Sequence, residues 1–383
     1  MTDTKNARRN GSEQRIIREI RRSGALGRGE LVRRTALPRS SVFAIVGDLV
    51  ERGVLVETSR PGDARRGRGR PGALVSLDPA AGLIVGVDVG REATRLVVAN
   101  AAHQIVAAGV SEEPAAEDAG ACAVQIETLI HSVCAVDDID LDALEAVGIG
   151  VYGLPEIHES ATRSPRDLTS ELSNRLEVPV ALGNNTRLAA LAEATWGAGR
   201  GVDDQVYVRW SVGVGGGCLV GGRLLVGANG AAGEIGHVCL DPNGPRCDCG
   251  GHGCLETLVG GPALLEICRQ RGLDLRSLDD LVEAVQARIA VASDVVVQAA
   301  RRLGVVLAGT VALLDPQRVI IGGELGQVGS LVLEAIHEKI DALSMPGLGR
   351  TVEVVRADLG MNDGALGAVA HVLRSRQPTT TAG

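Results

Sequence analysis

One histidine and three cysteines that could together bind a metal ion lie close together between Gly233 and Glu256. They are His237, Cys247, Cys249 and Cys254, in the pattern H-x9-C-x-C-x4-C. One imidazole and three thiolates form the tetrahedral Cys3His set that zinc takes in closed structural sites. The glycines between them let the chain turn around an ion, because glycine adopts backbone angles that other residues avoid. We therefore expect a structural zinc ion, with Cys239 and His252 as alternative ligands, rather than a chance cluster of buried or oxidised cysteines.

Two carboxylates flank this cluster. Glu234 lies just before His237, and Glu256 lies just after Cys254. Four protein ligands saturate a tetrahedral zinc ion, so the metal needs neither carboxylate. Both are expected to face a second ligand beside the metal.

The same stretch resembles the signature of a known family. The sequence GEIGH, followed by C-x-C-G-x-x-G-C-L-E, is similar to the motif of ROK proteins, a family of repressors, unclassified reading frames and sugar kinases. The resemblance implies that the histidine and the three cysteines hold zinc. It also implies that Glu234, Glu256 and His237 face a sugar.

The composition places the chain among globular proteins of two or three domains. It has 383 residues, of which 45% are hydrophobic but only 1% aromatic, so alanine, valine, leucine and isoleucine must build the core. No apolar run approaches the ~20 residues of a membrane span. The N-terminus is polar and lacks a signal peptide. We therefore expect a cytoplasmic protein with no membrane partner, whose cysteines are reduced or metal-bound.

Charge is distributed unevenly along the chain. Residues 1–77 carry 17 Lys and Arg against 8 Asp and Glu, whereas the remainder carries 22 against 39. A basic segment attached to an acidic body favours a separate nucleic-acid-binding module. The alternative is a solvated basic face without a nucleic-acid partner.

Hydrophobic periodicity in the basic segment supports the DNA-binding interpretation. Three short helices in this order, with a tight turn before the third, are typical of a helix-turn-helix, and the two strands after them make it a winged one. The expected helices cover residues 13–23, Arg28–Thr35 and a segment from Arg39 or Ser40 to Gly53, and the expected strands cover Val54–Glu57 and Ala73–Leu77.

The third helix and the wing contain the candidate DNA contacts. The N-terminal residues of a recognition helix lie nearest the bases in the major groove. The loop between the two strands contains Arg68-Gly69-Arg70-Pro71, which resembles an AT-hook, and narrow minor grooves attract arginine. A flexible linker with incidental charge is the alternative. The expected contacts are Arg39, Ser40, Ser41, Arg65, Arg66, Arg68 and Arg70.

The body, from Ala81 onward, alternates strands with helices and resembles the actin-like, ribonuclease H-type fold of ROK kinases. The strand Leu83–Gly90 ends in Asp-x-Gly, as the first phosphate loop of the kinases does. Arg91 and Glu92 stand where those kinases have Gly and Thr, and such side chains prevent the close backbone approach that a phosphate needs. The expected second phosphate loop, Ser211–Gly217, also lacks its first glycine.

A pair of asparagines marks the largest departure from a kinase. In ROK kinases the matching pair is Asn-Asp, where the Asn holds a sugar hydroxyl and the Asp accepts the proton of the attacking hydroxyl. Here the pair is Asn184-Asn185. A carboxamide has no basic site near neutral pH, so it cannot act as a general base. The loop Tyr152–Pro155 keeps only part of the family's Pro-Gly-Pro motif.

These features predict four regions. Residues 1–79 form the winged helix, residues 80–190 the first body lobe, completed by a terminal helix over 361–377, and residues 191–360 the second lobe with the zinc site. Residues 378–383 form a disordered tail, because their Thr/Pro-rich composition cannot bury a core.

We therefore predict a ROK-family transcriptional regulator, acting as a repressor, with a catalytically inactive kinase-like body and no catalytic residue. Its partners would be double-stranded operator DNA and a small-molecule effector, a sugar or sugar derivative, and it would form a homodimer or homotetramer. The expected effector-binding residues are Asn184, Asn185, Glu234, His237 and Glu256. Two alternatives remain: an active sugar kinase with a DNA-binding appendage, and a ligand-independent DNA-binding protein whose body serves for dimerisation.

Overall fold

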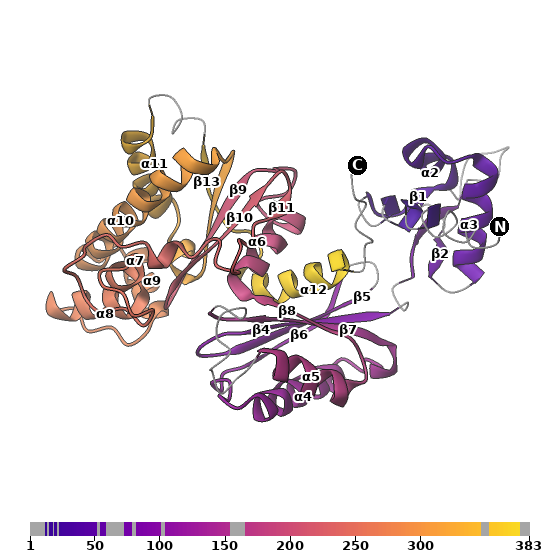
Figure 1. Ribbon diagram of the computed structural model, residues 1–383, viewed down its shortest axis with the longest axis horizontal. Helices are drawn as coiled ribbons and strands as arrows, with labels where there is room; N and C mark the ends of the chain where they lie inside the picture. Colours follow the sequence, from indigo (N-terminus) through magenta and orange to yellow (C-terminus); the bar gives the residue numbers. More distant parts are fainter. Residues whose placement is uncertain are drawn as a thin grey trace. The chain divides into compact units, whose positions relative to one another are not determined.

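The computed structural model describes most of the chain (Figure 1). The described residues are 12–13, 15–17, 19–20, 23–51, 54–58, 73–78, 82–100, 104–153, 165–345 and 352–375. The chain divides into two compact units. The first comprises Met1–Val85, Val97–Ala108 and His131–Ala146, and the second comprises Gly86–Leu96, Gly109–Ile130 and Val147–Gly383. The boundary expected after residue 79 and the C-terminal tail lie outside the described residues.

The N-terminal part of the first unit is a small helical domain with a three-stranded sheet. Its elements are β1 Leu26–Gly27, α2 Arg28–Thr35, α3 Arg39–Glu51, β2 Leu55–Thr58 and β3 Leu74–Leu77, and the strand order is β1-β3-β2. The described residues of 12–20 are helical, and Ile16 and Ile20 are buried with Leu31 of α2 and Val46 of α3 in one core. The predicted winged helix-turn-helix arrangement is confirmed.

A tight turn separates α2 from α3. Ala36 ends α2 in the left-handed conformation, with φ of 52°, and the backbone N–H of Val42 already donates to the carbonyl of Pro38. Val42, Val46 and Leu49 then recur on one face of α3 and are fully buried. This spacing aligns the helix with its apolar side inward, so Arg39 and Ser40 at its first turn are exposed.

The body contains two five-stranded sheets. The first has the order β6-β5-β4-β7-β8, with β4 Leu83–Val89, β5 Thr94–Asn100, β6 Ile105–Ser111, β7 Leu144–Val151 and β8 Val180–Asn184. Every residue of β4 is buried, as a central strand covered on both faces requires. The α-helices described in this region are α4 Ala119–Val136 and α5 Pro165–Leu176, and a short 3-10 helix, Leu141–Ala143, precedes β7.

The second sheet lies entirely in the second unit and has the order β11-β10-β9-β12-β13. Its strands are β9 Gln205–Trp210, β10 Val214–Val220, β11 Arg223–Leu224, β12 Arg318–Gly322 and β13 Glu353–Arg356. β12 pairs in parallel with both β9 and β13, whereas β10 is antiparallel to β9. Helices pack on this sheet around one large aliphatic core, and α10 and α11 lie side by side (Figure 1). These helices are α7 Leu255–Val259, α8 Gly261–Gln270, α9 Leu278–Gln286, α10 Ala290–Leu314 and α11 Ser330–Leu343.

Two further helices, α6 Asn185–Trp196 and α12 Asp363–Ser375, pack tightly against each other. Three glycines of the expected second phosphate loop, Gly215, Gly216 and Gly217, lie within β10, and α6 packs directly on Gly215 and Gly217. A side chain at Gly217 would collide with Ala190 of α6. The turn between β9 and β10 is confined to the short segment from Ser211 to Gly213.

Within the part of the chain that the structure describes, two helices, α4 and α10, are long and apolar enough to be compared with membrane spans. Of their most apolar stretches, 44% and 56% of the residues are buried inside the protein. The α/β body predicted from the sequence is confirmed.

Candidate functional site

A polar cleft of about 370 Å³ lies in the second unit, where the ends of several strands and helices meet. All five residues expected to bind an effector line it: Asn184, Asn185, Glu234, His237 and Glu256. The cleft also contains three of the departures noted in the sequence, at Arg91, Glu92 and Tyr152. The fold therefore brings residues from widely separated segments of the sequence together in one cleft.

Asn184 has a structural role as well as a place in the cleft. It is the N-cap of α6, and its side-chain oxygen accepts a hydrogen bond from the backbone N–H of Arg187 at 2.9 Å. Its amide nitrogen donates to the carbonyl of Gly153 at 2.7 Å. A carboxamide has two donor hydrogens and two acceptor lone pairs. Asn184 therefore retains one of each for a ligand.

The two glutamates of the cleft are held by different means. Glu256, in the first turn of α7, accepts a hydrogen bond from the backbone N–H of Val214 at 2.9 Å, which fixes it beside the β9–β10 turn. The carboxylate of Glu234 lies 3.9 Å from Nε2 of His237. Acceptors of this kind can bind the hydroxyl groups of a polyhydroxylated ligand.

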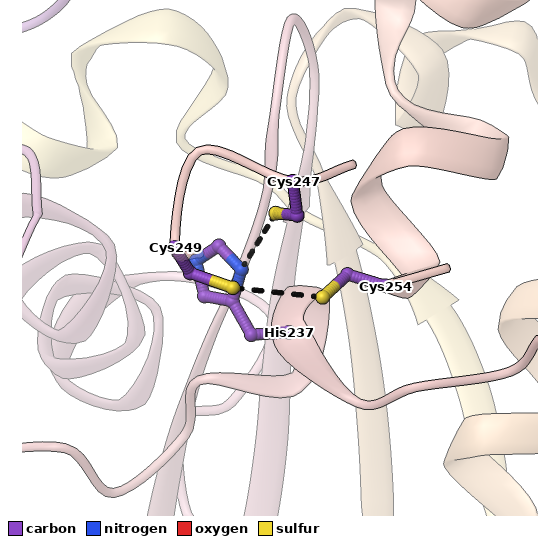
Figure 2. A group of neighbouring side chains, drawn as sticks. All are labelled: His237, Cys247, Cys249 and Cys254. Carbon is purple, nitrogen blue, oxygen red and sulfur yellow. Dashed lines mark hydrogen bonds between the residues drawn. The ribbon is translucent and has the colours of Figure 1, made fainter. Parts of the chain in front are cut away.

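His237 joins the cleft to a cluster of candidate metal ligands, which it forms with Cys247, Cys249 and Cys254 (Figure 2). This group is called the metal-binding cluster below. Its Nδ1 lies 3.5 Å from Sγ of Cys247, while its Nε2 faces Glu234. An imidazole that binds a metal through one nitrogen is held in orientation by the group at its other nitrogen. A metal in the cluster would therefore fix the ring that forms part of the cleft wall.

The four predicted metal ligands are assembled in one place. The ligand atoms of His237, Cys247, Cys249 and Cys254 all lie within 4.8 Å of one another, and Sγ of Cys249 is 3.6 Å from Sγ of Cys254. Figure 2 shows the side chains converging from the loop that carries Cys247 and Cys249 and from the segments on either side of it. This donor set, an imidazole and three thiols, fits a tetrahedral metal ion. The alternative ligands Cys239 and His252 are not part of the group.

A network of buried charges lies at the base of the cleft. Arg209, on β9, donates to Asp88 of β4 at 3.0 Å and to Asp363 of α12 at 2.5 Å. The side chain of Arg209 is 17% exposed, and those of Asp88 and Asp363 are 6% and 3% exposed. The Tyr207 hydroxyl also donates to Asp363. One guanidinium therefore compensates two nearly inaccessible carboxylates.

The ionisation of this network follows from its burial and charges. Burial by itself lowers the pKa of Arg209, but the charges of Asp363 and Asp88 outweigh that effect and raise its pKa well above the ordinary value. Burial and then the charge of Asp363 raise the pKa of Tyr207 well above its usual range, so the phenol keeps its proton and remains a donor. Arg209 therefore keeps its positive charge between the two carboxyl groups.

Asn185 belongs to the same network. Its amide nitrogen donates to Oδ1 of Asp88 at 2.9 Å, and both residues are buried. The sequence comparison identified Asn185 as a missing base but not as a hydrogen-bond donor to Asp88. A single signal in the sequence points to the network, namely a charged residue, Arg209, near the end of the largely apolar segment VYVRW.

Arg91 and Glu92 lie at the rim of the cleft. The Arg91 guanidinium stacks over the ring of Tyr152, 5.5 Å from its centroid, and its Nη1 is 3.9 Å from the carboxylate of Asp248 in the metal-binding loop. Both charged groups of this pair are exposed, so the contact is weak in water. Arg91 therefore lies at the edge of the cleft, in the loop where a kinase of this family would bind phosphate.

The predicted DNA contacts are partly described. Arg39 and Ser40 are exposed at the start of α3, and Ser41 is half-buried. The guanidinium groups of Arg28 and Arg39 lie 5.2 and 5.3 Å from the ring centroid of Phe43, whose side chain is 36% exposed. Arginine stacked on an exposed ring forms a basic surface at the helix start. Arg65, Arg66, Arg68 and Arg70 lie outside the described residues.

Comparison with known proteins agrees with this architecture. A model of the ROK family matches residues 84–375, and a model of the MarR family matches residues 10–66. The DNA-binding transcriptional dual regulator NagC of Escherichia coli K12 is 28% identical, over 94% of this chain and 91% of that protein. A glucokinase of Thermotoga maritima is 33% identical, over 55% of this chain and 70% of the enzyme.

A solved structure has the same fold over almost the full length. The crystal structure of a ROK family transcriptional regulator, a homolog of the Escherichia coli MLC protein, gives a TM-score of 0.77 at 24% identity and covers 95% of each chain. The family match includes the cleft, the charge network and the metal-binding cluster. The chain belongs to the ROK family and carries a MarR-like winged helix in front of the ROK body, as a transcriptional regulator does.

Proposed function

We propose that this ROK-family transcriptional repressor binds operator DNA through its winged helix and a sugar or sugar derivative in its cleft, without phosphorylating that ligand. The observation that carries the proposal is the pairing of Asn185 and Arg209 with Asp88. This pairing leaves a cleft that is suited to binding a ligand but not to transferring a phosphoryl group to it. The ligand can alter DNA affinity only to the extent that it binds one state of the body more tightly than the other.

Two physical arguments oppose catalysis. Phosphoryl transfer needs a group that accepts the proton of the attacking hydroxyl, and Asn185 has no basic site. The carboxylate of Asp88, which ends the strand entering the expected phosphate loop, is already neutralised by Arg209. Loss of a general base alone costs on the order of 10² to 10⁴ in rate.

A coupled assay of ADP release tests this part of the proposal. The full chain is incubated with ATP, magnesium and a panel of glucose, N-acetylglucosamine, N-acetylmannosamine and fructose, with an active sugar kinase as the positive control. We expect no turnover above background. Turnover near the enzyme median of ~10 s⁻¹ on any sugar would establish the alternative, a kinase that also binds DNA.

The effector is proposed to be a polyhydroxylated molecule because the cleft presents the carboxylates of Glu234 and Glu256 and the amide of Asn184. A thermal-shift screen of neutral sugars and their phosphates identifies the ligand. The Glu256→Gln variant keeps the shape of the wall but removes a charged acceptor, so it should weaken binding of the identified sugar. If no sugar or sugar phosphate stabilises the protein, the ligand-independent alternative is favoured.

The metal is proposed to be one zinc ion with a structural role in the cleft wall. Four ligands saturate a tetrahedral ion, so elemental analysis of the purified protein should find about one zinc per chain. His237 links that ion to Glu234, so removal of the metal should also weaken effector binding. A folded, metal-free protein with undiminished effector affinity would contradict the structural role.

The DNA-binding surface is proposed to be the first turn of α3, with the arginines of the wing. We expect the protein to act in the cytoplasm as a homodimer or homotetramer on near-palindromic sites, because a cyclic dimer presents two recognition helices. Binding should weaken steeply with salt. Arg39→Ala should reduce affinity for the operator about 10-fold or more. Arg33→Ala is the matched control, because Arg33 is exposed on α2 and pairs with Glu30.

Operator fragments selected from random DNA by the full chain provide the measurement, followed by footprinting. A chain lacking residues 1–77 should lose the footprint. If it protects the same site as the full chain, the winged helix is not the DNA-binding domain. We also propose that the chain divides into residues 1–79, 80–190, 191–360 and the C-terminal tail. The same truncation, together with limited proteolysis, tests this division.

A further inference from the structure

A fifth cysteine lies next to the metal-binding cluster without belonging to it. Cys239 is exposed and stands outside the group of four ligand atoms. Its backbone nevertheless pairs with that of Cys254, one of the four, in an isolated antiparallel bridge. Cys254 is 2% exposed, so the bridge places an accessible thiol opposite a buried ligand.

The hydrogen bonds around this bridge define its geometry. Leu240 donates to the carbonyl of Gly253 at 2.8 Å, and Leu255 donates to the carbonyl of Val238 at 2.9 Å. These bonds flank the pair, so Cys239 and Cys254 form a non-hydrogen-bonded pair. Such residues have Cα atoms about 4.5 Å apart and side chains on the same face.

A disulfide between these two residues is sterically possible. Disulfides join cysteines whose Cα atoms are roughly 4.4 to 6.8 Å apart, and a non-hydrogen-bonded pair lies within that range. The bridge is held tightly by Gly253, whose φ is +56°. A Cβ at this position would collide with the backbone of Asp241. Because the chain at Gly253 packs this closely on Asp241, the two backbone segments of the bridge stay side by side.

We propose that Cys239 is an oxidant-sensing thiol that forms a disulfide with Cys254 and thereby releases the metal from the cluster. A hydroperoxide is the oxidant. The Cys239 sulfur attacks one peroxide oxygen, giving a sulfenic acid and water or an alcohol. The Cys254 sulfur then attacks the sulfenic sulfur, the S–O bond breaks, and the oxygen leaves as water. Two thiols are oxidised to one disulfide, and the peroxide is reduced.

Metal loss follows from the ligand count. A sulfur atom in a disulfide no longer carries the thiolate charge that binds zinc, so oxidation leaves His237, Cys247 and Cys249 as a three-ligand set. His237 also forms part of the cleft wall, 3.9 Å from Glu234. Oxidation would therefore loosen the wall and weaken effector binding. This consequence rests on the proposed zinc and effector functions, whereas the disulfide itself does not.

A competing reaction exists within the cluster. Cys249 is exposed as well, and its Sγ lies 3.6 Å from Sγ of Cys254. Direct oxidation would then join Cys249 to Cys254 without Cys239. Cys239 is favoured because its thiol is exposed and lies outside the group of four ligand atoms, so a peroxide can reach it while a metal holds the other sulfurs.

The test treats the full-length, metal-loaded protein with hydrogen peroxide. A chromophoric chelator measures metal release, and mass spectrometry of alkylated, unreduced peptides maps the disulfide. Cys239→Ser is compared with the wild type and with Cys218→Ala. Cys218 is a suitable control because burial raises the pKa of its thiol to about 11, and it lies in β10 outside the cluster.

We expect the wild type and Cys218→Ala to form the Cys239–Cys254 disulfide and lose metal, and dithiothreitol with added zinc to reverse both changes. Cys239→Ser should retain its metal under the same treatment. If Cys239→Ser releases metal as fast as the wild type, or if the mapped disulfide joins only Cys247, Cys249 and Cys254, the inference is overturned. If the untreated protein contains no metal, the zinc proposal fails. The disulfide map alone then shows whether Cys239 forms a disulfide with Cys254.

Discussion

Replacement of Arg209 tests whether the charge network stabilises the body. Arg209→Met preserves the length and apolar stem of the side chain but removes the cation between Asp88 and Asp363. Removing one partner of a buried ion pair costs about 3–5 kcal/mol, because the remaining charge stays buried without compensation. Here two carboxylates, 6% and 3% exposed, lose the same partner. We expect a loss at the upper end of that range at pH 7.

Removal of one of the two carboxylates should offset part of this loss. Without the guanidinium, the carboxylates of Asp88 and Asp363 remain buried as two like charges with no cation between them. Asp88→Asn in the variant background removes one of these charges and should therefore restore part of the stability.

Urea unfolding followed by tryptophan fluorescence provides the measurement. The chain has two tryptophans, Trp196 and Trp210, and both lie in the second unit, so the signal reports on the body. Trp210 is fully buried and directly follows Arg209. Arg318→Met is the matched control, because Arg318 on the neighbouring strand pairs with the largely exposed Glu353, and such surface pairs contribute about 1 kcal/mol or less. A loss for Arg209→Met no greater than the loss for this control would refute the reasoning.

Three further changes have defined outcomes. Asn185→Asp should lower the free energy of unfolding by about 2 kcal/mol and give no kinase activity, because it replaces a donor to Asp88 with a second carboxylate. Urea unfolding measures the first effect and the ADP assay the second. A variant that is more stable than the wild type, or that is active as a kinase, would contradict this account. Burial, followed by the charge of Arg374, lowers the pKa of His371, so stability is present above the unfolded pKa of about 6.5 and declines as pH falls below it. His371→Gln should reduce that decline in unfolding experiments between about pH 6.5 and 5, and an unchanged slope would exclude His371 as its source. Cys249→Ser should lose the metal by elemental analysis, while Cys239→Ser keeps it; the reverse result would reassign the ligand.

Much of the metal site could be predicted from the sequence because it is local. His237, Cys247, Cys249 and Cys254 lie within one short, glycine-rich stretch, so ligand chemistry and spacing alone bring them together. Only the tertiary structure excluded Cys239 from the group and placed it opposite Cys254. That distinction depends on the register of a two-residue bridge, which composition and spacing do not determine.

The winged helix could also be predicted, since its evidence lies in short-range periodicity. Val42, Val46 and Leu49 recur at helical spacing, and the tight turn at Ala36 to Pro38 separates two helices. The glycine run after Ser211 was harder to interpret. Glycines suit a phosphate loop, but they also let a helix approach a strand closely, and the structure shows α6 packed on Gly217 in β10.

The charge network could not be read from the sequence, because it joins residues that are far apart in the chain. Asp88 lies near the end of β4, Arg209 lies in β9 and Asp363 begins α12, and no pattern in the sequence specifies that these three residues meet. The sequence determined that Asn185 cannot act as a base, since that property belongs to the amide itself. Only the fold decided that this amide donates to Asp88, because the contact depends on how α6 and β4 pack in three dimensions.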